Sequence, residues 1–429
     1  MKFYSFLILG FLIISNVGAQ DDEYVYPELR NYDFTYQDNI KSIQFHLADS
    51  KTEYPIISLQ SPSHLVFSFD DLDADNKDYS YKVIHCNADW TPSEDIDPME
   101  YIDGYQENRF YEQQNSFSTV TEYTHYEITF PNEDLKFTKS GNYLLKIYLD
   151  EDEDALIITR RFMVFDTKMK VVPNMRRSAA PPNAATHQEL HFSVQHAGIQ
   201  VGNPREEVKV AVLQNGRWDN AFTSEDLEAT FIDDEKIVFD KQGQLAFPGY
   251  KEFRPLDLRS FIFRTQQVQN MERIENQFHL KLFNDFSREH SAYLFTHDLN
   301  GKFYIQTHDN NDWKLQGEYG HVYFSLEMPK RSDKVYLFGN FSDWQVRKEF
   351  EMTYNEKRKT YEYKGLFKNG FYDYQYVVAE DQYTQPNGIP TEGSTFEAEN
   401  DYLFLVYYRA FGSLYDELVA IQKFNSRPE

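Results

Sequence analysis

Short runs in which apolar and polar residues alternate recur along most of the chain. Examples are HLVFSF from His64, YSYKVIHC from Tyr79, THYEITF from Thr124 and KVYLFG from Lys334. Alternation with period two, rich in aromatic and β-branched residues, is typical of a strand with one buried face. Turn-forming residues separate the runs, and long helical periodicity is missing until the last residues. The pattern predicts a mainly β protein built from tandem sandwich-like domains.

Two polar intervals divide this series of strands. PNMRRSAAPPNAAT, residues 173–186, indicates a boundary near residue 168, and THDNNDWKLQGE, residues 307–318, indicates another near residue 310. We therefore expect three β domains, over residues 20–168, 169–310 and 311–411.

The end of the chain has a different spacing of apolar residues. Leu414, Leu418, Ile421 and Phe424 are separated by four, three and three residues. This spacing predicts a short amphipathic helix within residues 412–429. We expect the helix to pack on the last domain rather than to serve as a partner helix.

The first twenty residues, MKFYSFLILGFLIISNVGAQ, have the features of a secretory signal peptide. One basic residue, Lys2, precedes an apolar run from Phe3 to Ile14, and small residues end at Ala19. We expect cleavage after Ala19 and export of the mature chain. Cleavage there would expose Gln20 rather than a cysteine, so no bacterial lipoprotein anchor is expected. The apolar run is also too short to span a bilayer.

Composition narrows the classes of function. The chain is 41% hydrophobic and 17% aromatic, which is ample for several cores, and its single cysteine cannot form an internal disulfide. The formal net charge is −26. Such an acidic surface disfavours nucleic acid and anionic lipid as partners.

The single cysteine, Cys86, follows a histidine in IHCNADW, residues 84–90. Successive side chains on a strand leave opposite faces, so His85 cannot act as the base for Cys86 if both lie in the YSYKVIHC strand. We expect Cys86 to be a buried structural residue.

Two motifs resemble metal sites but lack necessary features. Asp71, Asp73 and Asp75 have the alternate spacing of a calcium loop, yet Asn76 stands where the loop needs glycine and Lys82 where it needs glutamate. HQELH, residues 187–191, has the alternation of a strand, on which two histidines four residues apart lie about 13 Å apart. We expect no metal site, no cofactor and no enzyme activity, because catalytic sequence motifs are also missing.

Two tryptophans admit more than one interpretation. Asn215-Gly216 predicts a tight hairpin that places Arg217 and Trp218 just beyond a turn. Trp218 is then either an exposed partner contact or a core residue. VYLFGNFSDW and TYEYKGLFKNGFYDYQYVV resemble the early-set β-sandwich found beside glycogen-acting enzymes. That resemblance implies an immunoglobulin-like fold, and we expect Trp344 to pack rather than to bind sugar.

Several long sequence segments occur in an order that resembles one family over nearly the whole mature chain. They are IHCNADWTPSEDIDPMEYIDGY, THYEITFPNEDLKFTKSGNYLLKIY, THQELHFSV, VLQNGRWDN, FPGYKEFRPLDLRS, DLNGKFYIQ and VYLFGNFSDW. The family is the type IX secretion system plug protein of Bacteroidetes. The resemblance implies a non-enzymatic periplasmic protein that docks on the inner mouth of the giant outer-membrane β-barrel translocon. Such a plug closes the barrel when no cargo passes, without itself entering the membrane.

Docking is expected to use aromatic-bearing loops at one end of the sandwiches, because loops on rigid scaffolds carry function and interface anchors favour Trp, Tyr and Arg. The candidates are Trp90, Met99 and Tyr101 from the first domain and Arg217 and Trp218 from the second. The competing hypothesis is a carbohydrate-binding module, based on the last domain and on the many aromatic residues.

Overall fold

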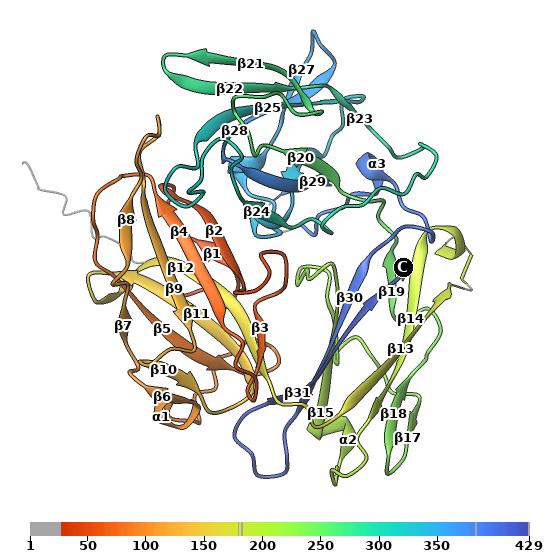
Figure 1. Cartoon of the computed structure of the whole chain (residues 1–429). Coiled ribbons are helices and arrows are strands. Elements are labelled where there is room, and N and C mark those ends of the chain that lie inside the picture. The colour runs from red at the N-terminus through yellow and green to blue at the C-terminus, as the bar shows by residue number, and fades with distance from the viewer. Residues whose placement is uncertain (1–26, 179, 182, 382–383, 428–429) are drawn as a thin grey trace, which may run out of the picture.

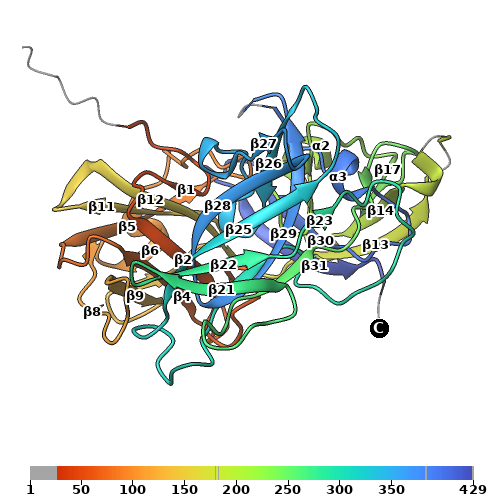
Figure 2. The ribbon, with the colours of Figure 1, turned by 90° about the horizontal axis from the view of Figure 1, so that it is seen from above.

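The computed structural model describes residues 27–178, 180–181, 183–381 and 384–427. The expected signal peptide lies outside these residues. Strands dominate the described chain and form three β-sandwiches, which confirms the mainly β class. Figure 1 shows the N-terminal and middle sandwiches side by side with the third above them, and Figure 2 shows that the third lies across the other two.

The N-terminal sandwich has two antiparallel sheets, with one parallel pair at β3. One sheet contains β1 (Phe34–Thr35), β12 (Asp152–Phe165), β11 (Gly141–Leu149), β5 (Tyr79–Cys86), β7 (Asn108–Arg109) and β3 (Ile56–Ser58). The other contains β2 (Ile40–Leu47), β4 (Leu65–Asp71), β9 (Thr124–Phe130) and β8 (Gln113–Asn115). A small pair, β6 (Ile102–Gly104) and β10 (Leu135–Phe137), follows helix α1 (Pro98–Tyr101). Buried aromatic rings fill the space between the sheets, including Phe67, Phe69, Tyr126 and Phe162.

The middle sandwich combines strands from distant parts of the chain. One sheet contains β13 (Lys170–Arg177), β14 (His187–Gln195), β18 (Lys236–Phe239), β17 (Phe231–Ile232) and β19 (Ala246–Pro248). The other contains β16 (Phe222–Thr223), β15 (Val208–Gln214), β30 (Asp401–Tyr408) and β31 (Glu417–Asn425). Helix α2 (Pro204–Glu207) precedes β15, and a 3-10 turn, Asn183–Ala185, precedes β14.

The C-terminal sandwich lies between β19 and β30 in the sequence. One sheet contains β20 (Arg254–Asp257), β29 (Gly370–Ala379), β24 (Phe303–Ile305) and β26 (Lys334–Phe338). The facing sheet contains β21 (Val268–Ile274), β22 (Gln277–Leu282), β25 (Tyr319–Glu327), β28 (Thr360–Lys368), β27 (Thr353–Asn355) and β23 (Asp285–Phe286). Helix α3 (Ile389–Glu392) and two 3-10 turns, Asn340–Ser342 and Lys348–Phe350, complete this part of the chain.

The expected C-terminal helix is wrong, because residues 417–425 form strand β31. This strand pairs with β30 along its length, and Leu418 and Val419, which point to opposite faces, are both fully buried. A strand covered on both faces need not show period two. The spacing of Leu418, Ile421 and Phe424 therefore resembled a helix by coincidence.

Strand pairing does not follow the predicted boundaries at residues 310 and 411. Strands β20 to β24 precede residue 310 yet belong to the C-terminal sandwich, while β30 precedes residue 411 yet pairs with β15 of the middle sandwich. We therefore propose a division in which the C-terminal sandwich is inserted into the middle one. Sequence composition marks local linkers and carries no information on which distant strands pair.

Helices in the described ranges are a single turn long. None of them is long and apolar enough to cross a membrane.

Candidate functional site

The loop after β5 and the hairpin after β15 meet at the junction of the first two sandwiches. The ring centroids of Trp90 and Trp218 are 5.2 Å apart, with their planes at 88°. The guanidinium carbon of Arg161 lies 4.5 Å from the Trp90 ring centroid and 5.2 Å from that of Trp218. Burial lowers the pKa of Arg161 to about 10, against the opposing charge of Asp33. The two tryptophans therefore pack on each other and on a shared cation.

Cys86 lies in the same junction. It ends strand β5 and is fully buried, as expected, in a cluster with Leu144, Met163, Leu213 and Leu405 that joins the outer faces of two sheets. Burial raises the pKa of the Cys86 thiol to about 12. His85 points to the opposite side of the strand, where its Nδ1 and the hydroxyl of Ser93 are 2.9 Å apart. The expected burial of the cysteine is therefore confirmed, and so is its separation from His85.

Arg217 joins the middle sandwich to the C-terminal one. Its side chain is 2% exposed and forms a two-pronged ion pair with Asp219, at 2.7 and 3.1 Å. The guanidinium carbon lies 5.0 Å from the Phe338 ring centroid and 5.6 Å from that of Trp344. Trp344 is buried against Phe338, as the sequence predicted.

Tyr101 and Met99 belong to α1 but differ in accessibility. Asp97 and Glu100 form a capping box that fixes the start of this turn. Tyr101 is buried, with its ring centroid 5.6 Å from that of His85. The Met99 side chain is 76% exposed.

The five candidate contacts thus occupy different environments. Met99 is open to solvent, Trp218 is partly buried, and Trp90, Tyr101 and Arg217 are buried. Contact with a partner stays a prediction for all five. Sequence reasoning did not foresee that the Trp90 and Trp218 loops contact each other, because period-two patterns report burial within one sheet and not contact between domains.

A buried ionic network joins the N-terminal and C-terminal sandwiches. The carboxylate of Asp70 accepts hydrogen bonds from Lys368 Nζ and the Tyr319 hydroxyl, both at 2.6 Å, and pairs with His125 Nδ1 at 2.7 Å. The side chains of Asp70 and Lys368 are each 1% exposed. Burial raises the pKa of Asp70, but Lys368 and His125 outweigh it and the net direction is down. Here too, the partners come from strands too distant in sequence for a motif to reveal.

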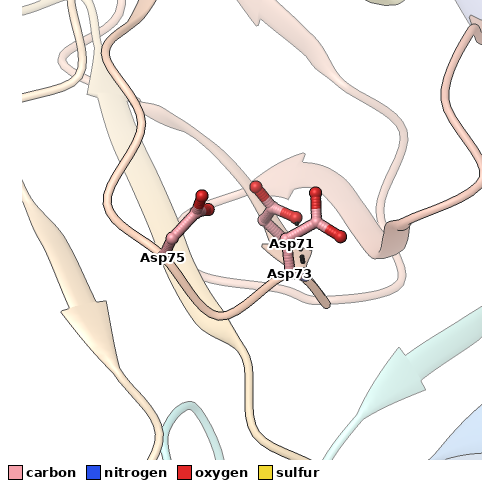
Figure 3. A group of neighbouring side chains, drawn as sticks. All are labelled: Asp71, Asp73 and Asp75. Carbon is pink, nitrogen blue, oxygen red and sulfur yellow. Dashed lines mark hydrogen bonds between the residues drawn. The ribbon is translucent and has the colours of Figure 1, made fainter.

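In the described ranges, the acidic loop after β4 is the one place where three or more possible metal-ligating side chains lie close together. Asp71, Asp73 and Asp75 each offer a carboxylate oxygen, and these oxygens lie within 4.8 Å of one another (Figure 3). The ammonium of Lys77 lies 2.8 Å from an Asp71 oxygen and 3.4 Å from an Asp75 oxygen, and it also pairs with Asp73. Tyr79 and Asn39 donate to Asp71 as well. A lysine thus provides the cation that balances this loop.

The HQELH segment is part of β14, as predicted. His191 Nε2 lies 2.9 Å from a Glu189 oxygen, and the same oxygen accepts the backbone N–H of Gly243. The glutamate is therefore engaged in local structure.

A cavity of about 770 Å³ lies where the three sandwiches meet. Its lining includes cations and carboxylates, among them Lys51, Arg161, Lys302, Glu53 and Asp343. Burial lowers the pKa of Lys51 to about 8. The mixed charge of the lining does not favour a ligand of one sign.

These features define a protein of three β-sandwiches joined by buried aromatic and ionic contacts. Residues 40–166, nearly all of the N-terminal sandwich, match the family described as the type 9 secretion system plug protein 1st domain. Over this part, the match confirms the resemblance to the plug protein family found in the sequence.

The fold also occurs in a solved structure. A hypothetical protein from Parabacteroides merdae ATCC 43184, whose crystal structure was determined at 2.30 Å resolution, superposes with a TM-score of 0.87. The two sequences are 28% identical, and the match covers 93% of this chain and 100% of the other. No curated protein matches the chain.

Proposed function

We propose that this protein is a non-enzymatic periplasmic plug that docks on the periplasmic opening of the outer-membrane type IX translocon barrel. It closes the barrel when no cargo is being exported. The observation that carries the proposal is the match of residues 40–166 to the plug domain family.

The joined sandwiches support this role. A wide barrel that stands open would leak solutes, and a protein that blocks it must not deform under load. The contacts of Asp70 with Lys368 and of Trp90 with Trp218 bind the sandwiches into one body. The signal peptide expected from the sequence and the strongly acidic chain support export and docking on protein rather than on lipid.

The five candidate contact residues have two different roles in this proposal. Met99 is accessible for direct contact, whereas the buried Trp90, Tyr101 and Arg217 position the loops around it and around Trp218. Alanine at Met99 is expected to weaken binding without loss of thermal stability. Alanine at Trp90 is expected to lower the melting temperature.

The test of the proposed function is purification of the tagged protein from its native envelope in mild detergent. We expect one very large outer-membrane β-barrel, identified by mass spectrometry, at near equimolar ratio and without bound secretion cargo. Recovery of the protein alone would contradict the proposal.

The carbohydrate-binding alternative has less support, because the ring of Trp344 is covered by Phe253 and Phe338. It predicts that soluble glucan shifts tryptophan fluorescence of the full-length protein, whereas the plug proposal predicts no change.

A further inference from the structure

The loop between β30 and β31 carries the most exposed large apolar side chain in the described ranges. Phe411 is 99% exposed, and Leu414 in the same loop is 52% exposed. The backbone N–H of Ser413 donates to the carbonyl of Ala410 at 2.8 Å, and Gly412 has a φ of 84°. A positive φ suits glycine. The loop tip is therefore a defined turn that displays a phenyl ring to solvent.

A buried carboxylate fixes the base of this loop to two sandwiches. Asp416 is 1% exposed and accepts hydrogen bonds from Arg409 Nε at 2.7 Å and from Lys209 Nζ at 3.0 Å. It also accepts the backbone N–H of Ala88, at 3.0 Å, and Arg409 donates to the side chain of Asn87 at 2.6 Å. Ordering the loop in advance reduces the entropy that binding must overcome.

Met99 lies at the same end of the molecule. The ring of Tyr415, at the base of the loop, lies 5.3 Å from that of His85, which in turn lies 5.6 Å from the ring of Tyr101. Figure 1 shows α1 and the loop after β30 together at the lower end of the molecule. Phe411 and Met99 thus form parts of one end that two joined sandwiches support.

The charge beside Met99 indicates the chemistry of the partner. Residues 94–100 contain four exposed acidic side chains and no basic one, namely Glu94, Asp95, Asp97 and Glu100. Carboxylates disfavour an anionic membrane surface and favour a protein with an apolar pocket and a basic rim. Resting on the proposed function, we propose that Phe411, Leu414 and Met99 form the surface that docks on the translocon rim.

Apolar side chains are also exposed at the opposite end, on the C-terminal sandwich: Ile262, Phe263, Phe283 and Phe286. That end belongs to a single sandwich outside the matched residues 40–166. Its edge strand β21 has a register shift between Val268 and Asn270 and charged residues at its far end, features that discourage pairing with another strand. It provides a control surface.

The test uses full-length tagged protein with Phe411→Glu or Met99→Glu, and Phe263→Glu as the matched control. All three positions are at least 74% exposed, so the variants should keep the wild-type melting temperature. Each variant is titrated against the detergent-solubilised translocon barrel. We expect Phe411→Glu to weaken binding at least about tenfold, as for a central aromatic anchor, and Phe263→Glu to change it less than about twofold.

The outcomes separate the proposal from the proposed function. If the wild type binds the barrel and Phe411→Glu binds equally well, the docking surface is wrong and the plug function stands. If only Phe263→Glu loses binding, the opposite end docks. If the wild type does not bind, the plug function itself is wrong. If the protein floats with anionic vesicles and Phe411→Glu abolishes this, the surface binds lipid. If the protein dimerises in light scattering and Phe411→Glu abolishes this, the surface binds a second copy. Either result would overturn the proposal.

Discussion

Replacing Lys368 with methionine should strongly destabilise the contact between the N-terminal and C-terminal sandwiches. The ammonium of Lys368 lies 2.6 Å from Asp70, and both side chains are 1% exposed. Methionine keeps most of the volume of lysine but removes its charge. Asp70 would then retain only the neutral Tyr319 hydroxyl and His125 as partners.

The magnitude follows from the burial of both groups. Removing one partner of a fully buried ion pair costs about 3–5 kcal/mol, because the remaining charge stays out of water without that partner. For a chain of 429 residues, an unfolding entropy of about 2.1 cal/mol/K per residue turns this loss into a fall of about 3–6 °C in melting temperature. The double variant Asp70→Asn with Lys368→Met removes both charges and should recover at least half of the loss.

Differential scanning calorimetry measures these changes, and Lys330→Met provides the control. Lys330 pairs with Glu356 at 2.6 Å, but both side chains are about 60% exposed, so its loss should cost less than about 1 kcal/mol. The reasoning would be refuted if Lys368→Met lost no more stability than Lys330→Met, or if the double variant were less stable than the single one.

Three further predictions concern His125, Cys86 and Leu418. Burial lowers the pKa of His125, but Asp70 and Glu127 outweigh it and the net direction is up. The stability that His125 contributes is therefore fully present below its ordinary pKa of about 6.5 and is lost as pH rises through its folded pKa. The melting temperature should accordingly fall as pH rises across this range. This pH dependence should be missing from His125→Gln. The Cys86 thiol, with a pKa raised to about 12, should resist iodoacetamide at pH 8 until the protein is unfolded. Rapid alkylation of the folded protein, detected by mass spectrometry, would contradict this. Leu418→Ala should cost about 2–5 kcal/mol in denaturant unfolding, because the side chain is fully buried between two sandwiches, and a cost below about 1 kcal/mol would contradict that.

Local alternation was enough to predict the strands. The run from Tyr79 to Cys86 forms β5 with the same bounds. A core on one face of a sheet requires apolar residues at every second position of the strand. The same reasoning correctly separated His85 from Cys86. It failed at Leu418, where burial on both faces removes the alternation.

Contacts between sandwiches could not be predicted in this way. The rings of Trp90 and Trp218 meet across 128 positions of sequence, and Asp70 meets Lys368 across 298. Each partner carries a local signal of burial or charge, but the choice of partner depends on how whole sandwiches pack. The exposure of the Phe411 ring was not predicted either, because residue 411 was taken as the end of the third domain.

The insertion of one sandwich into another determines when the protein is complete. Strand β13 begins at Lys170, yet its sandwich closes only when β31 has paired with β30, near the end of the described chain. Because the chain emerges N-terminus first, its first and third sandwiches can fold before β30 and β31 are available to pair beside β15. A chain that stops before Asp416 lacks both the strand and the carboxylate that hold the Phe411 loop. Only a chain that includes β31 can therefore display that loop in its fixed form, so the docking surface forms after the middle sandwich has closed.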